Sequence, residues 1–301
     1  MKQSFHSGYV SIIGRANVGK STLLNTMLDE KVSIVTRKPQ TTRHHCLGIH
    51  NLEHAQIVFI DTPGIQKTPR QAINQYMNRQ AAFAMQDVDV LLFMVEALKW
   101  QEQDEHVLNL LQSSRSSAKF LVINKADKAD KAGDKTKLLP FIESLQAKTS
   151  FDEIFPISAK NKQGIQALEQ AIIKYLPANM PIYPEDVISD RNERFFAAEY
   201  LREKLMMRLS DELPYELTIT IDDFKEKNDV YHIYACIWVE KASQKNIVIG
   251  KQGEILKKAG KDARLDMEKL FAKKVNLKTW VKIKKKWTDS EQALKLFGYD
   301  N

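Results

Sequence analysis

Eight residues near the N-terminus constrain this chain more than any other feature of its sequence. Gly14-Arg15-Ala16-Asn17-Val18-Gly19-Lys20-Ser21 matches the pattern G-x-x-x-x-G-K-S/T of a phosphate-binding loop. The apolar run Tyr9–Ile13 precedes it and a helical pattern, Lys20–Leu28, follows it, as the motif requires. Its glycines let main-chain N–H groups converge on phosphate oxygens, and the helix start adds a partial positive charge. The sequence therefore predicts a nucleotide site on a strand-to-helix turn.

The residues of this loop have distinct predicted roles. Lys20 is expected to reach the β- and γ-phosphates, and the Ser21 hydroxyl to ligate Mg²⁺. Contacts to the nucleotide are expected from the whole loop and the residue that follows it: Gly14, Arg15, Ala16, Asn17, Val18, Gly19, Lys20, Ser21 and Thr22. A chance match in an ordinary strand–turn–helix is the alternative, which further motifs are needed to exclude.

A second motif, Asp61-Thr62-Pro63-Gly64, lies directly after the predicted strand Gln56–Ile60. Asp61 is expected to hold Mg²⁺ through a water molecule. The Gly64 N–H is expected to contact the γ-phosphate, so this loop would sense whether that group is present. Taken alone the motif is weak evidence, because Pro-Gly is ordinary turn chemistry.

A third motif, Asn124-Lys125-Ala126-Asp127, follows the predicted strand Lys119–Ile123 and selects the base. The Asp127 carboxylate can accept from both the ring N–H and the exocyclic amine of guanine, a pair of donors that adenine lacks. A site built for such bonds rejects the wrong base by ~10⁴-fold or more. Asn124 and Lys125 are expected to support the pocket, and Ser158-Ala159-Lys160 to close its other side. Together the motifs predict a GTP/GDP site with Mg²⁺.

Apolar runs alternate with helical patterns over residues 8–176. Further strands are predicted at Cys46–His50, Val88–Val95 and Glu153–Ile157, and helices at Ala72–Met85, Asp104–Leu111, Leu138–Leu145 and Ile165–Leu176. This order predicts an α/β fold, a P-loop GTPase domain with a doubly wound, mostly parallel sheet. Asn51–Ala55 resembles a hairpin turn, which makes one edge antiparallel. Each motif ends a strand, where open α/β sheets bind their ligands.

Pro177, Pro181 and Pro184 cannot continue a helix and predict a stiff linker. We place the GTPase domain at residues 1–176, the linker at 177–190, a second domain at 191–286 and a C-terminal tail at 287–301. The periodicities of the second domain predict the order α-β-β-α-α-β, from a helix at Arg191–Leu209 to a strand at Val275–Ile283.

The second domain carries a basic block, with 15 Lys/Arg against 4 Asp/Glu in residues 241–286. Such a block is typical of a chain with an anionic partner, although by its charge alone a solvated, lysine-rich surface is the favoured interpretation. Gly250-Lys251-Gln252-Gly253 precedes a basic helix, and a helix–GxxG–helix clamp lets a nucleic-acid backbone approach closely. Trp280 and Trp287 either stack on bases or pack in the core. RNA contacts are predicted for Ile249, Gly250, Lys251, Gln252, Gly253, Lys257, Lys258 and Lys282.

With these motifs in place, the segment Lys38-Pro39-Gln40-Thr41-Thr42-Arg43-His44 resembles the first switch of the bacterial Era GTPase family. The resemblance extends from Ser7 to Lys286, because that family carries an α+β type II KH domain behind its GTPase domain. It implies that Thr42 ligates Mg²⁺ when GTP is bound, with Thr41 as the alternative. It also implies that the KH domain binds the 3′ end of small-subunit 16S ribosomal RNA during assembly of the 30S subunit.

Hydrolysis of GTP is expected to depend on Lys20, Thr42, Asp61 and Gly64. Ile65 stands where Ras-like GTPases carry a water-orienting glutamine, and Era-like GTPases share this hydrophobic replacement. Catalysis then rests on Mg²⁺, the loop amides and a further cation. In related GTPases an asparagine at the position of Asn17 helps to hold K⁺, so K⁺ is a further expected cofactor.

Cys46 and Cys236 predict no disulfide framework, and no apolar run approaches the ~20 residues of a membrane span. We therefore expect a monomer in the cytoplasm. The alternative is a peripheral GTPase on the cytoplasmic face of the inner membrane, acting in cell-cycle or metabolic regulation. Its Lys273–Lys286 block would then bind anionic lipid.

Overall fold

The computed structural model describes residues 4–65, 67, 71–112, 116–131, 134–210 and 213–299. They form two compact units. The first holds most of the chain up to Asp190, and the second holds the chain from Arg191 onward. Two short pieces of the N-terminal half, Ile34–Thr41 and the described part of Arg70–Tyr76, belong to the second unit.

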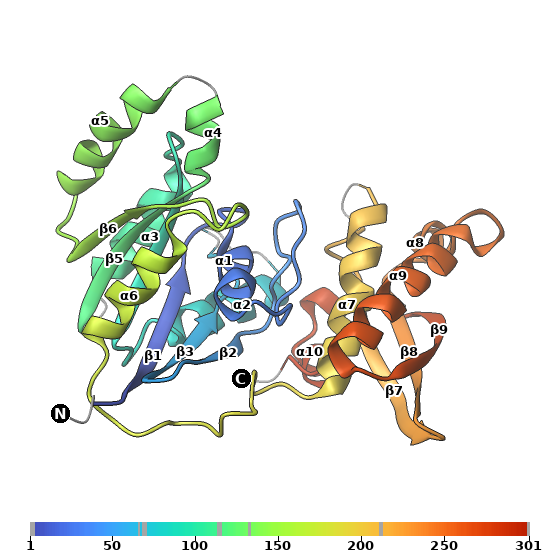
Figure 1. Ribbon diagram of the computed structural model, residues 1–301. Coiled ribbons are helices and arrows are strands. Elements are labelled where there is room, and N and C mark those ends of the chain that lie inside the picture. Colours follow the sequence, from blue (N-terminus) through green and yellow to red (C-terminus); the bar gives the residue numbers. More distant parts are fainter. Residues whose placement is uncertain are drawn as a thin grey trace. The chain divides into compact units, whose positions relative to one another are not determined.

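The first unit is built on a six-stranded sheet with the order β2-β3-β1-β4-β5-β6 (Figure 1). Only β2 runs antiparallel to its neighbour, through the predicted hairpin with β3. The P-loop GTPase architecture expected from the sequence is confirmed. The strands are β1 (His6–Ile13), β2 (Cys46–Asn51), β3 (Ala55–Asp61), β4 (Val90–Glu96), β5 (Ala118–Asn124) and β6 (Glu153–Pro156).

Helices cover both faces of this sheet, which is why β4 is buried along its whole length and apolar from Val90 to Val95. Residues of α2, α3 and α5 share one apolar cluster with Phe93 and Leu121. On the opposite face Tyr175 of α6 packs edge-on against Phe120, the residue beside Leu121 in β5. The helices are α1 (Lys20–Leu28), α2 (Ala72–Phe83), α3 (Glu102–Gln112), α4 (Ala126–Lys131), α5 (Lys135–Gln146) and α6 (Ile165–Tyr175).

Residues 177–190, predicted as a linker, lie along the edge of the sheet that β2 forms. The Ile49 N–H donates to the Ile188 carbonyl at 3.0 Å, and the Leu47 N–H to Asp190 Oδ1 at 2.9 Å. Buried Gln56 accepts from the Ile182 N–H at 2.7 Å. The segment is thus hydrogen-bonded to the first unit.

The second unit contains a three-stranded sheet of order β7-β8-β9 in which β8 and β9 run parallel. The predicted α-β-β-α-α-β order is confirmed. One apolar core joins the helices to the inner face of the sheet and includes Leu201, Ile233, Ala259 and Val281. The elements are α7 (Glu193–Arg208), β7 (Thr218–Lys227), β8 (Val230–Val239), α8 (Ala242–Ile249), η1 (Lys251–Gly253), α9 (Glu254–Phe271) and β9 (Lys274–Ile283).

The described part of the C-terminal segment packs onto this unit through a short turn, η2 (Trp287–Asp289), and α10 (Glu291–Leu296). Trp287 is fully buried. It stacks on Tyr299, and its Nε1 donates to the Glu216 carbonyl at 3.1 Å. Of the two interpretations of this tryptophan, core packing is therefore the one that holds. Among the helices that the structure describes, none is both long and apolar enough to cross a membrane.

Candidate nucleotide site and basic groove

The phosphate loop joins β1 to α1 in a tight curl that side chains would obstruct. Gly14 and Gly19 have φ of 153° and 110°. A Cβ on Gly14 would lie 2.4 Å from the Met94 carbonyl oxygen, and one on Gly19 would lie 2.3 Å from Asn124 Nδ2. The sequence thus places glycine where neighbouring chain segments leave no room for a side chain.

Lys20 lies at the centre of the curl, where its Nζ donates to the carbonyls of Gly14 at 3.0 Å and Arg15 at 3.1 Å. Burial lowers the pKa of Lys20 to about 8, although the Asp61 carboxylate raises it. A phosphate at this position would supply the negative charge that restores full protonation of the amine.

Three predicted metal-site residues meet beside the loop. Ser21 Oγ lies 2.9 Å from Thr42 Oγ1 and donates to Asp61 Oδ2 at 2.8 Å. Ser33, which belongs to none of the sequence motifs, also donates to Asp61 Oδ2, at 2.6 Å. Thr41 is held elsewhere, because its Oγ1 donates to the Lys38 carbonyl at 2.7 Å. The geometry therefore places Thr42, and not Thr41, in this corner.

This corner fits a magnesium ion. Asp61 is fully buried and its Oδ1 has no hydrogen-bond partner. Burial raises the pKa of Asp61, against the bonds from Ser33 and Ser21 and the charge of Lys20, which lower it. A cation reached directly or through water would satisfy that oxygen. Among the described residues no three His, Cys, Asp or Glu side chains form a metal-binding group, so hydroxyls and phosphates would supply the other ligands.

The base-reading motif is tied to the phosphate loop by one buried amide. Asn124 Nδ2 donates to the Val18 carbonyl at 2.7 Å, and its Oδ1 accepts from the Ala159 N–H at 3.0 Å. Lys125 Nζ donates to the Asn17 carbonyl at 2.8 Å. The Asp127 carboxylate accepts from Ser158 Oγ at 2.6 Å. With the bonds of Asp61 described above, the four motifs at the strand ends lie together in the structure. Lys160, the last residue of the motif that begins at Ser158, is exposed.

A cluster of charges that the sequence motifs did not reveal supports the loop. The Arg15 guanidinium pairs with Asp104 at 3.0 Å and with Glu96 at 3.4 Å. Burial alone would raise the pKa of Glu96, but Lys125 and Lys128 bring it down to about 2. Arg15 therefore contributes its backbone to the loop while its side chain anchors the loop to α3 and β4. The partners lie 81 and 89 positions away, a separation that no local pattern reveals.

The loop after β3 approaches the phosphate loop closely. A Cβ on Gly64 would lie 2.8 Å from the Ala16 nitrogen. Thr62 Oγ1 donates to the Ile12 carbonyl at 2.8 Å and fixes the start of the loop. Ile65 is 5% exposed and packs in the apolar cluster of α2 and α3. It therefore neither reaches nor polarises a water molecule. Gln66 lies outside the described residues.

The predicted GxxG clamp joins α8 to α9. Gly250, Gln252 and Gly253 all have positive φ, of 74°, 52° and 79°. A Cβ on Gly250 would lie 2.7 Å from Ile255 Cγ1, whereas one on Gly253 would meet nothing within 4 Å. Gly250 thus permits the turn itself, and Gly253 presents bare backbone to an open space.

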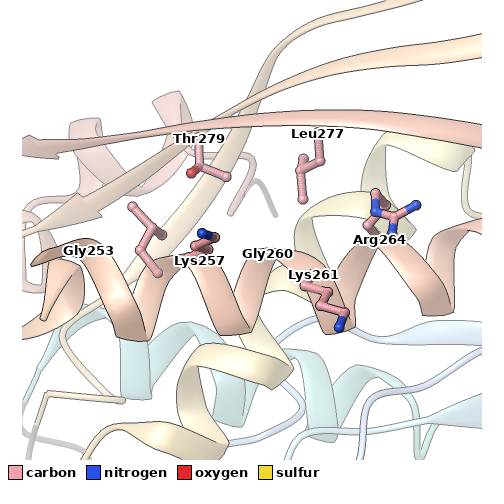
Figure 2. Close-up of a pocket in the computed structure, with 8 residues that line it drawn as sticks. Gly253, Lys257, Gly260, Lys261, Arg264, Leu277 and Thr279 are labelled. Carbon is pink, nitrogen blue, oxygen red and sulfur yellow. The ribbon is translucent and has the colours of Figure 1, made fainter.

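That open space is a groove of about 350 Å³ between α9 and β9. Figure 2 shows Leu277 and Thr279 pointing from the strand toward the helix. Of the predicted RNA-contacting residues, Gly253 and Lys257 line the groove. The groove is also lined by residues that no sequence motif singled out: Leu256, Gly260, Lys261, Arg264, Leu277 and Thr279. The lining residues of α9 are spaced three and four positions apart, which places them on one face of the helix. That spacing can be seen in the sequence.

The other predicted RNA contacts do not line this groove: Ile249, Gly250, Lys251, Gln252, Lys258 and Lys282. Lys258 is exposed and pairs with Glu254 at 2.5 Å. Lys282 lies on the outer face of β9, with its Nζ 5.3 Å from the centre of the Trp238 ring and 3.4 Å from Asp222. Trp280 shares that outer face, is 49% exposed and stacks on Tyr234. The structure therefore separates Lys282 and Trp280 from the clamp.

The fold and its sites define a P-loop GTPase joined to a KH domain. Family models agree: one described as a 50S ribosome-binding GTPase matches residues 9–125, and one described as a KH domain matches residues 212–288.

Similarity to known proteins extends over the whole chain. The GTPase Era of Pseudomonas putida strain W619 is 47% identical over 97% of this chain and 96% of its own length. The GTPase Era of Pseudomonas entomophila is 46% identical over 98% of this chain and 97% of its own length. A crystal structure of an Aquifex aeolicus Era variant bound to GDP and AlF4⁻ superimposes with a TM-score of 0.93 at 38% identity, covering 99% of this chain and 100% of that one. A structure of Era with MgGDPNP and nucleotides 1506–1542 of 16S ribosomal RNA gives the same values. The chain belongs to the Era family of GTPases.

Proposed function

We propose that this GTPase binds the 3′ end of 16S ribosomal RNA through its KH groove and assists assembly of the 30S subunit, with GTP controlling the bound state. The observation that carries the proposal is the groove between α9 and β9, where Gly253 presents bare backbone beside Lys257, Lys261 and Arg264. The relative solved with nucleotides 1506–1542 of 16S ribosomal RNA supports the choice of RNA.

The groove suits a single strand of nucleic acid. Gly260 lies in the middle of α9, where glycine costs about 1 kcal/mol relative to alanine, and a Cβ there would meet nothing within 4 Å. This keeps the groove floor open for a sugar-phosphate backbone. Lys257, Lys261 and Arg264 supply positive charge, and Leu277 gives an apolar surface for a base.

The chemistry of hydrolysis follows from the nucleotide site. Lys20 and the loop amides would hold the β- and γ-phosphates, while Ser21, Thr42 and Asp61 would hold Mg²⁺, which neutralises charge on the transferred phosphoryl group when bound. The Gly64 N–H would meet the γ-phosphate from the other side. Because Ile65 cannot orient water, slow turnover is expected in the absence of a stimulating partner.

K⁺ is proposed as a further activator on the basis of Asn17. This residue is exposed at the rim of the phosphate loop, has a φ of 64°, and its carbonyl accepts from Lys125. Turnover in KCl is expected to exceed turnover in NaCl of equal ionic strength, and Asn17→Ala is expected to remove the difference. Equal rates of the unaltered protein in the two salts would refute K⁺ activation.

RNA binding is favoured over membrane binding as the role of the basic block. Lys274–Ile283 is a strand within a sheet, and not the amphipathic helix that usually lies on a lipid surface. We also propose a cytoplasmic location and a monomeric state. Co-sedimentation with anionic vesicles that RNA does not compete away would support the membrane alternative.

The test of the proposed function is binding of a labelled oligonucleotide from the 16S 3′ end, against a scrambled sequence of equal length. Affinity is measured with GDP and with a non-hydrolysable GTP analogue. The 3′-end sequence is expected to bind more tightly, and its affinity is expected to differ between the two nucleotide states. Affinity is also expected to fall with salt, with a log–log slope of about −0.7 per phosphate neutralised. Equal affinity for the two sequences would refute the proposed target.

A further inference from the structure

The outer face of the KH sheet, the side turned away from α7, α8 and α9, carries aromatic and basic side chains in alternation. Lys278, Trp280 and Lys282 take this face of β9, because Leu277 and Val281 between them belong to the apolar core on the other face. All three outward residues are exposed.

Two rings on this face form a stacked pair. Trp280 stacks on Tyr234 of β8, with the ring planes 12° apart and the centroids 5.7 Å apart. Lys278, which lies opposite Tyr234 in the register, has its Nζ 5.4 Å from the centre of that ring. Trp280 is nevertheless 49% exposed, whereas the other three tryptophans of the chain, all of them described, are half-buried or buried. A ring that a neighbour holds in place, with half of its surface open, can stack on a nucleic-acid base.

The C-terminal segment covers a different part of the outer face. Phe297 packs on Trp238 with the ring centroids 5.2 Å apart, and the Tyr299 hydroxyl lies 3.0 Å from Thr218 Oγ1. Thr218 and Trp238 are partners in the ladder between β7 and β8. The chain thus covers its own rings at this end of the face, and Trp280 stays open.

Charge on the outer face favours β9 as the path of an anionic chain. The acidic side chains Asp222 and Asp223 belong to β7, at the opposite edge of the sheet. Asp223 pairs with Lys225 of its own strand at 2.8 Å, and Asp222 lies 3.4 Å from Lys282. Both partners of the second pair are about half exposed, so this pair is weak and its lysine can turn to a phosphate.

Strand β9 also borders the groove that we propose for RNA. Leu277 and Thr279 line the groove from the inner face, and Lys278 and Trp280 alternate with them on the outer face. Because β9 is the edge strand in the order β7-β8-β9, a chain that leaves the groove over this edge reaches the outer face within the width of one β-strand.

We propose that Trp280, held by Tyr234 and flanked by Lys278, is a second RNA contact, which stacks on a base of the single strand that continues from the groove over the edge of β9. The inference rests on the proposed binding of RNA in the groove. Every base has a π-face, so this contact adds affinity without reading sequence, and discrimination between sequences stays with the groove.

RNA suits this face better than a lipid surface does. Lipid binding uses a broad apolar face. Here a single exposed indole lies among Lys278, Lys282 and the exposed amide of Asn276, and His232 lies opposite Asn276 in the register. These neighbours offer charges and hydrogen bonds to a nucleotide.

The test measures how the effect of Trp280→Ala depends on the length of the RNA. The full chain is titrated with an oligonucleotide of about twelve nucleotides from the 16S 3′ end, and with its tightest-binding piece of about four nucleotides, the length that a KH groove grips. Trp280→Ala is expected to bind the long strand roughly tenfold more weakly and the short strand within twofold of the unaltered protein. Trp280→Phe, which keeps a ring, is expected to retain most of the affinity. Long-strand affinity of Trp280→Ala within twofold of the unaltered protein, or an equal loss on both lengths, would overturn the inference.

A scrambled long oligonucleotide separates this inference from the proposed function. Because stacking tolerates any base, Trp280→Ala is expected to lose about tenfold on the scrambled strand as well. Equal binding of the two sequences by the unaltered protein would refute the proposed 16S target and leave the stacking contact in place. Absence of the Trp280→Ala loss with both sequences would overturn the inference and leave the target in place.

The contribution of Lys278 is tested by the dependence of affinity on salt. Lys278→Met is expected to reduce the log–log slope by about 0.7 on the long strand, the value for one phosphate contact. Lys225→Met is the matched control, because it removes an exposed lysine from the β7 side of the same face, and it is expected to leave the slope unchanged. Equal slopes for the two variants would count against a path along β9.

Fluorescence gives a measurement that does not depend on the alanine variant. The difference in emission between the unaltered protein and Trp280→Phe isolates the signal of Trp280. The long strand is expected to quench this signal, and the short strand to leave it unchanged. Emission of Trp280 that the long strand does not alter would overturn the inference even if Trp280→Ala failed to fold. Unchanged RNA affinity of Trp280→Ala together with lost co-sedimentation on anionic vesicles would assign the face to a lipid surface instead.

Discussion

Replacing Asn124 by alanine tests how the guanine and phosphate halves of the site are joined. Asn124 is 3% exposed, and its amide donates to the Val18 carbonyl at 2.7 Å and accepts from the Ala159 N–H at 3.0 Å. No other described motif residue bonds to both of these loops through its side chain. Its loss would leave two buried backbone groups without partners.

The size of the effect follows from those two groups. Each buried group left unpaired costs about 1–3 kcal/mol, so the free-energy cost of the two together lies between about 2 and 6 kcal/mol. Relaxation of the loops should bring the cost toward the lower limit. In the free variant the two loops can open and expose these groups to water, whereas bound nucleotide holds the loops closed, so the cost is met on binding. We therefore expect GTP and GDP to bind roughly 30- to 100-fold more weakly to Asn124→Ala.

The assay is titration of a fluorescent guanine nucleotide, with dissociation constants obtained by competition. Asn124→Asp is the informative partner, because its carboxylate still accepts from the Ala159 N–H but repels the Val18 carbonyl. It is expected to lose at least as much affinity as the alanine variant. Asn161→Ala, at an exposed position of the neighbouring loop, is the matched control and should change affinity less than twofold. Affinity of Asn124→Ala within threefold of the unaltered protein would refute the reasoning.

Two further predictions concern the amine in the phosphate loop and the clamp of the KH domain. The pKa of Lys20 is lowered to about 8 in the free protein, and bound phosphates raise it, so binding takes up a proton and weakens as pH rises above 8. GTP affinity should fall about tenfold between pH 7 and 9, whereas Lys20→Arg, which stays charged, should bind weakly but with little pH dependence; a flat profile for the unaltered protein would contradict this. Gly253→Asp places a carboxylate in open space beside the groove, so RNA affinity should fall at least tenfold while GTP hydrolysis stays unchanged, and retained RNA binding would show that the strand lies elsewhere.

The nucleotide site was predictable because its chemistry is encoded in short motifs. Each motif fixes a local turn, and the rule that parallel strands end at one edge brings Asp61, Asn124 and Ser158 together without further information. The hairpin before β3 and the antiparallel edge were likewise readable from periodicity and turn residues. Thr42 required the resemblance to a family, because Thr41 beside it has the same chemistry.

What the sequence did not reveal depends on contacts between distant positions. The pairing of Arg15 with Glu96 and Asp104 is invisible to any local pattern. The same holds for the hydrogen bonds that join Arg202 to the Thr41 carbonyl and Glu203 to the Val35 N–H. For Lys282 the alternation of β9 predicts the outer face, away from Leu277 and Thr279, and basic charge alone is what grouped it with the clamp. A lysine count cannot distinguish the two faces of a strand.

The most direct test of the account is calorimetric titration of the full chain with GTP, ATP and xanthosine triphosphate, before and after Asp127→Asn. The unaltered protein should bind GTP about 10⁴-fold more tightly than ATP, or better. The Asp127→Asn protein should bind GTP more weakly and xanthosine triphosphate more tightly, because an amide can donate to the oxygen that replaces the guanine amine. Comparable affinity for ATP and GTP, or an unchanged preference after Asp127→Asn, would contradict the assignment of Asp127 as the residue that reads the base.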